Sequence, residues 1–584
     1  MASKKQSAKN HSFPKETVWH SASHVLATAV KELFLEAKFG IGPAIDEGFY
    51  YDFLVAKPFS PQDLEAIEKK ANEIIKKDLA FERKEISKKE AQQLFKTQAF
   101  KLELIEELEE GKISTYSEGS FTDLCKGPHV QSTGQIGVLK VLKSSAAYWK
   151  GTQDRESMQR IYGIAFPTQP ELDAWLKLKK DAEDRSHLKL GKDLNLFLIS
   201  PEVGPGLPLF TPEGTIIREE LQKFLREEQL KRGYLPVVTP HITKAALYKT
   251  SGHLELYKDS MFPVMKTEGD EYYLKPMNCP HHIQIYQSKL RSYRELPLRY
   301  TEFGTVYRLE KSGELTGLTR VRMITQDDAH LFCTPGQVKD EILGIINLVL
   351  KIFKILDFKD YFVRFGTRDN SGKYMASDEA WISAEKNIEE SLKESGLKYF
   401  KAEGEAAFYG PKIDFVVKDV LGREWQLGTI QIDYNMPESF QLSYIGEDSK
   451  EHRPVMIHRA PFGSLERFEG ILIEHFGGKF PLWLSPVQVK ILAVSDKFND
   501  YAQKISSELK SNNIRVDLDL SSNTVSYKIR EAQLQKVPYV IVVGEREEKA
   551  GTVTVRDRLG KQFTEKAPAF LEKVLQQISE RSLN

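Results

Sequence analysis

The stretch that decides the fold is RYTEFGTVYRLE at residues 299–310, followed after a polar loop by LTRVRMITQDDAH at residues 318–330. Both parts alternate as β-strands do, and the loop between them carries two glycines. The pattern predicts an antiparallel hairpin with a long tip, its second strand running over 318–324. Arginines and carboxylates would then share one strand pair, which is costly unless a ligand pairs them. A solvated face with surface ion pairs is the alternative, but His330 favours a ligand because partners for it occur elsewhere in the chain.

The composition describes a large chain without a strong electrostatic preference. It has 584 residues, with Lys+Arg and Asp+Glu both at 83, so several domains of roughly 150 residues each are expected. The three cysteines, Cys125, Cys279 and Cys333, are too few for a disulfide framework and favour a reducing compartment. We find no secretory signal and no apolar run of about 18 residues. We therefore expect a cytoplasmic protein that does not enter a membrane, and we interpret Cys333 as a small core residue.

Changes of pattern divide the chain into five segments. The linker prediction rests on a long helical pattern dense in charge, and the last domain on alternating strands and helices. The predicted segments are a basic tail at 1–17, an α+β domain at 18–166, a linker helix at 167–196, a large domain at 197–484 and an α/β domain at 485–584.

Two pairs of side chains stand out in the domain at 18–166. His20 and His24 are four residues apart on a predicted helix and so share a face, and Cys125 and His129 are four apart beside a Gly-Pro turn. Cys and His are preferred zinc ligands, but they could equally position a water for hydrolysis. The sequence leaves both open. A buried thiol beside unrelated histidines ranks third, because two such pairs would seldom arise by chance.

The large domain carries its own chemistry-bearing motifs. A helix pattern at 216–231 leads to a short strand pattern at 234–240 limited by proline, which predicts an edge strand. KPMNCPHH at 275–282 supplies Cys279, and VMIHRA at 455–460 supplies His458 ahead of a strand–turn–helix pattern.

In this order, the motifs resemble the class II aminoacyl-tRNA synthetases and, more specifically, the threonyl-tRNA synthetase family. RLE at 308–310 with Arg320 resembles the second class-defining motif, and GSLERF at 463–468 resembles the third. The helix and strand ending at Pro240 resemble the first, which builds a homodimer interface in this class. The similarity covers the chain from residue 19 onward.

The resemblance implies an α+β multidomain architecture. It consists of a class II antiparallel-sheet catalytic core, an N-terminal α+β editing domain and a C-terminal α/β anticodon-binding domain. The family usually begins with a small ubiquitin-like domain, where this sequence has only the basic tail. It also usually has an aromatic residue at the position of Ile324 and glycine at that of His281.

The implied reaction joins L-threonine to tRNA(Thr) at the expense of ATP with Mg²⁺. Negative charge accumulates on phosphorus, so fixed arginines lower the barrier. The resemblance gives Arg308 and Arg467 catalytic roles and lets His253 assist acyl transfer. The implied ATP-binding set is Arg308, Glu310, Arg320, Gln431 and Arg467.

The implied zinc ligands are Cys279, His330 and His458, which we expect to come from three separate strands or loops. Three protein ligands leave an open position, as in catalytic zinc sites. A site that demands the threonine hydroxyl rejects valine, its near-isostere. The residues implied to contact threonine are Asp328, Tyr409 and Gln431.

Serine also carries the hydroxyl, and the missing methyl is worth only about 1–3 kcal/mol of discrimination. A second, hydrolytic site is therefore useful. The implied editing residues are His20, His24, Asp123, Cys125 and His129, and the implied anticodon residues are Lys536, Glu547 and Arg556. The alternative is a non-aminoacylating RNA-binding or regulatory paralogue, against which the intact arginines and zinc ligands count.

Overall fold

A computed structural model describes residues 13–583 apart from 110, 153, 371–373, 375, 376, 420 and 421. Most of the predicted basic tail therefore lies outside the described residues. The chain forms two compact units, Met1–Lys180 and Asp181–Asn584. Within the part of the chain that the structure describes, no helix is long and apolar enough to cross a membrane.

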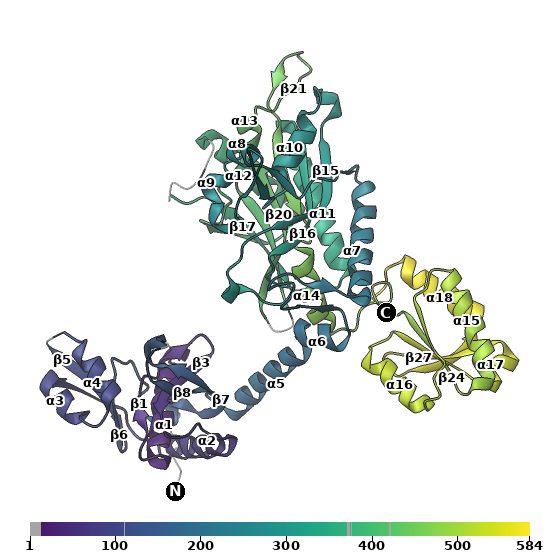
Figure 1. Ribbon diagram of the computed structural model, residues 1–584. Coiled ribbons are helices and arrows are strands. Elements are labelled where there is room, and N and C mark those ends of the chain that lie inside the picture. Colours follow the sequence, from purple (N-terminus) through teal and green to yellow (C-terminus); the bar gives the residue numbers. More distant parts are fainter. Residues whose placement is uncertain are drawn as a thin grey trace, which may run out of the picture. The chain divides into compact units, whose positions relative to one another are not determined.

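The first unit is built on two antiparallel sheets. In the larger one the strand order is β1-β3-β8-β7, with β2 on β3, and helices α1 and α2 pack along it (Figure 1). Helix α2 is capped by Ser60, whose side chain accepts from the Asp63 amide in a capping box. The helices are α1 Lys15–Leu33, α2 Pro61–Lys76, α3 Lys88–Leu94 and α4 Ala99–Glu106. The strands are β1 Lys38–Phe39, β2 Ala44–Ile45, β3 Gly48–Leu54, β4 Glu82–Ser87, β5 Lys112–Glu118, β6 Phe121–Leu124, β7 Val138–Tyr148 and β8 Ser157–Phe166.

The predicted linker is not one helix. The helical pattern divides into α5 Gln169–Arg185 and α6 His187–Asp193, with Ser186 between them. The boundary between the two compact units falls inside α5.

An eight-stranded sheet forms the centre of the second unit, in the order β11-β15-β16-β23-β20-β19-β17-β18. It is antiparallel except at its two ends, where β11 pairs with β15 and β17 with β18 in parallel. The predicted edge strand is therefore confirmed in position, although only two residues of it pair. The strands are β11 Leu235–Pro236, β15 Leu298–Tyr307, β16 Met323–Cys333, β17 Tyr361–Thr367, β18 Tyr399–Glu403, β19 Lys412–Lys418, β20 Glu424–Asp433 and β23 Val455–Ala460.

The predicted hairpin is confirmed, but the boundaries of its second strand are wrong. Strand β16 begins at Met323, opposite Tyr307, and continues to Cys333. The regular ladder stops before this segment: the Arg322 carbonyl still accepts from the Arg308 amide at 2.9 Å, but Leu318 and Thr319 bond to side chains from elsewhere in the chain. The alternating pattern there belongs to a loop held by tertiary contacts.

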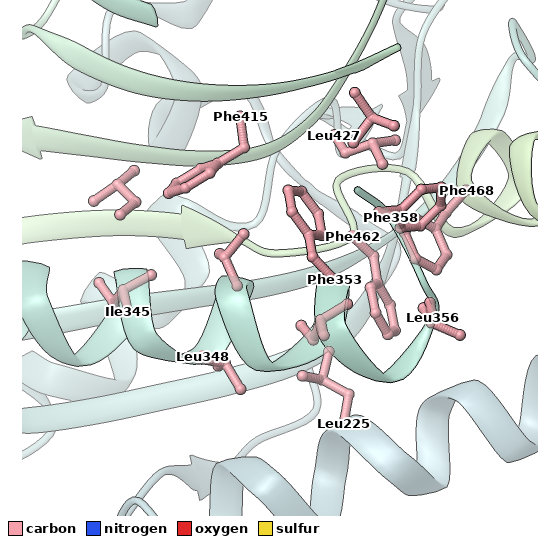
Figure 2. Packing of buried hydrophobic residues seen from close by; sticks show 14 of the residues in the cluster. Leu225, Ile345, Leu348, Phe353, Leu356, Phe358, Phe415, Leu427, Phe462 and Phe468 are labelled. Atoms are coloured by element: carbon pink, nitrogen blue, oxygen red, sulfur yellow. The ribbon is translucent and has the colours of Figure 1, made fainter. Parts of the chain in front are cut away.

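Helices cover the sheet and close its core. Figure 2 shows Ile345 and Phe353 of α11 on the side that faces Phe415 of β19, with the Phe353 and Phe415 rings 6.1 Å apart, whereas Leu348 points from the opposite side of the helix toward Leu225 of α7. Helix α7 has Thr211 as its cap and Pro212 in its first turn. The helices are α7 Pro212–Leu230, α8 Ala245–Thr250, α9 His253–Leu256, α10 Cys279–Gln287, α11 Val338–Ile355, α12 Asp378–Ser395, α13 Asn435–Ser439 and α14 Leu465–Phe476. Short strands complete this part: β9 Phe197–Leu198, β10 Leu209–Phe210, β12 Ile242–Lys244, β13 Met265–Thr267, β14 Asp270–Leu274, β21 Tyr444–Ile445 and β22 Glu451–His452.

The C-terminal part of the second unit alternates strands and helices as predicted. Its sheet has the order β25-β24-β26-β27-β28, with the first three strands parallel. The strands are β24 Val489–Ala493, β25 Val516–Asp519, β26 Tyr539–Val543, β27 Thr552–Asp557 and β28 Gln562–Lys566. The helices are α15 Asn499–Ser511, α16 Val525–Leu534, α17 Glu545–Ala550 and α18 Ala567–Ser579.

Candidate active site

Three buried metal-type side chains meet on the central sheet. His330 on β16 and His458 on β23 are direct cross-strand partners, and Cys279 is the first residue of α10. One potential ligand atom from each lies within 4.8 Å of the others. The expectation that all three come from strands or loops is wrong for Cys279, because the Asn-Cys-Pro turn starts a helix.

Each histidine of this cluster is held by a second side chain. His458 Nε2 lies 2.8 Å from Asp433 Oδ2, and His330 Nδ1 lies 2.8 Å from His282 Nδ1. His282 in turn contacts Glu302 at 3.2 Å. Each ligand ring therefore keeps one nitrogen for a metal while the other sets its orientation. Sequence reasoning missed these partners, because they are distant in the chain.

His281, the unexpected imidazole next to His282, is not part of this cluster. It is buried, and neither ring nitrogen has a hydrogen-bond partner among the residues that the structure describes. Its ring lies 6.4 Å from that of Tyr248.

The predicted threonine residues surround the same three side chains. Gln431 lies opposite His458 on β20, and Tyr409 donates a hydrogen bond to Gln431 while its ring lies 5.0 Å from that of His458. The Asp328 carboxylate accepts a hydrogen bond of 3.0 Å from Asn278. The three predicted residues are thus brought together. Gln431, which is predicted for both the ATP and the threonine sets, also donates to Thr429 at 3.3 Å.

The predicted ATP arginines gather at the other end of the hairpin. Burial lowers the pKa of Arg467, and the charges of Arg308 and Arg320 lower it further. Like charges held this close favour an anion between them. The buried Nε of Arg308 has no partner among the described residues. Glu310 pairs with Arg320 at 2.8 Å, so it also holds an arginine in place.

Two further predictions fall near these arginines. Ile324 is 9% exposed and packs with Val306 and Val321, so it closes an apolar wall at the position where the family has an aromatic residue. His253 is fully buried, with Nδ1 2.7 Å from Ser251 Oγ. Burial, with the charges of His458 and Arg308, lowers its pKa to about 4, which keeps the ring neutral.

A carboxylate that was not singled out for this role anchors the turn before α14. Asp327 accepts hydrogen bonds from the amides of Phe462 at 2.8 Å and Gly463 at 3.1 Å. Burial raises its pKa to about 8. Since Asp327 is on β16, this contact ties the hairpin to the helix that carries Arg467.

The second His-Cys cluster lies in the first unit. The Cys125 sulfur is 3.3 Å from His20 Nε2 and 3.1 Å from His129 Nε2, and His24 lies within the same group. His129 Nδ1 contacts Ser21 Oγ at 3.0 Å. Burial raises the pKa of Cys125 to about 12 and, with the neighbouring histidines, lowers that of His129 to about 2. The thiol and the imidazole are therefore neutral.

Asp123 connects this cluster to residues that sequence reasoning missed. Its carboxylate pairs with the buried Lys101, accepts from Tyr51 at 2.6 Å and lies 3.9 Å from His24 Nε2. Neither Lys101 on α4 nor Tyr51 on β3 carries a local signal for such a role. Only the packing of these elements brings them to Asp123.

The predicted anticodon residues do not form one group. Glu547 and Arg556 line a pocket of about 700 Å³ beside β27, whereas Lys536 lines a different pocket of about 420 Å³. Glu547 accepts from the Gly544 amide at 3.0 Å and from Thr554 at 2.8 Å, so its carboxylate stabilises the start of α17.

Comparison with known proteins matches three families to these parts. Residues 262–476 match the tRNA synthetase class II core domain (G, H, P, S and T), 488–580 the anticodon binding domain, and 113–162 the threonyl and alanyl tRNA synthetase second additional domain. A class II core with these additions defines a class II aminoacyl-tRNA synthetase.

The particular family follows from full-length relatives. The chain is 54% identical to threonine–tRNA ligase of Thermus thermophilus, over 97% of this chain and 89% of that one. It is 52% identical to that of Cytophaga hutchinsonii, over 94% and 86%. The chain therefore belongs to the threonine–tRNA ligase family.

Solved structures agree with this assignment. A structure described as the RNA binding domain of threonyl-tRNA synthetase from Cryptosporidium parvum matches 68% of this chain and 99% of its own, with a TM-score of 0.64 and 38% identity. A putative threonyl-tRNA synthetase, ThrRS-1, from Aeropyrum pernix matches 68% and 97%, with a TM-score of 0.61 and 31% identity.

Proposed function

We propose that this protein is a threonine–tRNA ligase that activates L-threonine with ATP, transfers it to tRNA(Thr) and hydrolyses mischarged seryl-tRNA(Thr). One observation supports the activation and transfer steps. The hairpin β15–β16 leads into Arg308 at its tip and carries His330 toward its other end, so one sheet presents both an anion site and a Cys-His cluster. Membership of the family supports the assignment.

In the activation step, a threonine carboxylate oxygen forms a bond to the α-phosphorus of ATP and pyrophosphate leaves. Arg308 and Arg467 would supply the fixed positive partners that the added negative charge needs. Both are held before substrate arrives: Arg467 by the Thr319 carbonyl and Arg308 against Tyr257. Mg²⁺ would accompany the ATP phosphates.

Cys279, His330 and His458 fit a zinc ion. Their donor types are those zinc prefers, and the Asp433 and His282 contacts leave one nitrogen free on each ring. Zinc bound there would supply open coordination positions to the amine and hydroxyl of threonine. Asp328 would assist at the amine, and Tyr409 and Gln431 would close the pocket around the substrate.

In the transfer step, the ribose hydroxyl of the tRNA 3′ end attacks the threonyl carbonyl and AMP leaves. His253, neutral and near His458 and Arg308, is a candidate to accept the proton. The pocket lined by Glu547 and Arg556 is the candidate anticodon contact.

The cluster in the first unit suits metal-free hydrolysis. Four ligands would complete a tetrahedral zinc site and leave no position for a water. Without a metal, the neutral His20 beside the Cys125 thiol is the candidate base to take a proton from a water that attacks the seryl ester, while His129, whose nitrogens contact Ser21 and Cys125, orients the thiol. The ester C–O bond then breaks and frees serine and the tRNA 3′ hydroxyl.

We further propose that the enzyme is a homodimer that uses the helix α7 and the strand after it as interface, and that it works in the cytoplasm. All three cysteines are free, in keeping with a reducing compartment.

Threonine-dependent exchange between ATP and labelled pyrophosphate tests the central proposal. We expect exchange with threonine, weaker exchange with serine and very little with valine. Absence of threonine-dependent exchange from zinc-supplemented enzyme would refute the ligase function.

A further inference from the structure

The loop between β15 and β16 is anchored by a histidine from outside the catalytic motifs. His187 is the first residue of α6 and is 4% exposed. Its Nε2 accepts a hydrogen bond of 3.1 Å from the backbone amide of Leu318. This contact joins residues 131 positions apart in the chain, so no local pattern could have predicted it.

The proton on His187 is assigned by its second partner. Nδ1 lies 2.6 Å from Glu474 Oε1, and the His187 amide donates to the same oxygen at 3.0 Å. Burial acts to raise the pKa of Glu474, but these hydrogen bonds and the charge of Arg423 outweigh it and keep the pKa below its ordinary value. An ionised carboxylate only accepts, so Nδ1 carries the proton and Nε2 is free to accept from Leu318.

The anchored amide is one residue from the carbonyl that orients Arg467. Leu318 donates to His187, and the carbonyl of Thr319 accepts from Arg467 Nε at 2.9 Å. The same loop leads directly to Arg320, which pairs with Glu310 at 2.8 Å. A shift of the loop at Leu318 would therefore displace both guanidinium contacts.

Close packing leaves this loop little freedom where His187 meets it. A Cβ at Gly317 would come within 2.1 Å of His187 Nε2, and Gly317 has a φ of +48°. On the opposite side, a Cβ at Gly470 of α14 would meet Leu318 at 3.3 Å and His187 at 3.6 Å. Helix α6, the loop and α14 thus meet at two glycines, with the histidine between them.

We propose that His187 is a positioning residue for the nucleotide: it holds the loop so that Arg467 and Arg320 are placed for ATP. The proposal rests on the ligase function proposed above. We therefore expect His187 to affect the binding of ATP but not of threonine, because the Cys-His cluster lies at the other end of β16.

Two substitutions separate the two hydrogen bonds of the ring. In His187→Asn, the side-chain amide can still donate to Glu474 from the position of Nδ1, but nothing accepts from Leu318. In His187→Gln, the carbonyl oxygen can reach the position of Nε2 and accept. His475→Asn is the control, because His475 on α14 is a partly buried histidine that contacts the Leu356 carbonyl at 3.1 Å and not the loop.

The measurement is threonine-dependent pyrophosphate exchange with ATP and threonine varied in turn. For His187→Asn we expect the KM for ATP to rise roughly tenfold, the scale of losing a buried hydrogen bond, with the KM for threonine within twofold of wild type. His187→Gln should recover most of the loss. His475→Asn should lower the thermal unfolding temperature and leave the KM for ATP unchanged.

A second pair of variants covers the case in which His187→Asn does not fold. Gly317→Ala would force the loop away from His187, whereas a Cβ at Gly313 in the same loop meets nothing within 4 Å. Only Gly317→Ala should raise the KM for ATP. If the wild type is active, an unchanged KM for ATP in His187→Asn or Gly317→Ala would overturn the proposal. An equal rise in the KM for ATP in His187→Asn and His187→Gln would also overturn it. Inactive wild type would instead refute the ligase function.

Discussion

The two His-Cys clusters use the same residue types in different surroundings. In the second unit, His330 and His458 each turn one ring nitrogen to an outer partner and leave the other free. In the first unit, the Cys125 sulfur already lies within hydrogen-bond distance of two imidazoles, and a Lys–Asp ion pair adjoins the group.

The difference shows that ligand type alone does not define the chemistry. Three ligands with an open position bind a metal that can recognise a substrate, whereas four equivalent donors either close around a metal or act without one. The outer contacts decide between these outcomes, because they determine which nitrogen of each imidazole is available.

The largest effect is expected from Cys279→Ser. Loss of a proposed zinc ligand should reduce threonine-dependent exchange by about 10³-fold and lower the zinc content per chain, measured by atomic absorption. Cys125→Ser, the matched change in the other cluster, should keep both the threonine-dependent exchange and the zinc content of the wild type. A wild-type enzyme with two zinc ions per chain would contradict the distinction between the clusters.

The variant Cys125→Ala should slow the hydrolysis of seryl-tRNA rather than the activation of threonine. Without the thiol that both imidazoles contact, clearance of seryl-tRNA should slow by roughly 10²-fold, the lower range for a displaced proton-transfer group. Deacylation of preformed seryl-tRNA measures this rate, with Cys333→Ala as a control for loss of a buried thiol elsewhere. Unchanged clearance would exclude the cluster as the hydrolytic site.

The side chains that orient a histidine in each cluster, Asp433 beside His458 and Ser21 beside His129, can be compared by mutation. Asp433→Asn should lower zinc affinity by about 10–100-fold, because the carboxylate that orients His458 becomes a neutral amide. Ser21→Ala removes the corresponding partner of His129 and should leave the zinc content unchanged. Competition with a chelator measures the affinity; equal zinc loss in both variants would show that both clusters bind metal.

The smallest effect should come from a change far from both clusters. Arg556→Ala should weaken tRNA binding by about 1–3 kcal/mol and raise the KM for tRNA in aminoacylation. Exchange without tRNA should stay at the wild-type rate. Lys549→Ala, an exposed change on α17, is the control, and an unaltered KM for tRNA in Arg556→Ala would remove Arg556 from the anticodon site.

Sequence reasoning was most successful where a signal is local. The helix with His20 and His24, the hairpin and the alternating C-terminal elements were each predicted in kind and approximate place. It was wrong at 318–322, where alternation predicted a strand but the backbone bonds to His187 and Arg467. It also gave the linker as one helix, where the structure has two.

By itself, the sequence determined which chemistry was available: arginines for an anion, Cys and His in two spaced sets, and a succession of elements from a known class. Only the tertiary structure decided which other side chains contact these arginines, cysteines and histidines and set their orientation. Lys101 reaches Asp123 across 22 residues, Asp433 reaches His458 across 25, and His187 reaches Leu318 across 131. Periodicity reports the face of an element within a few residues, whereas these contacts depend on sheet register and on how helices pack against it.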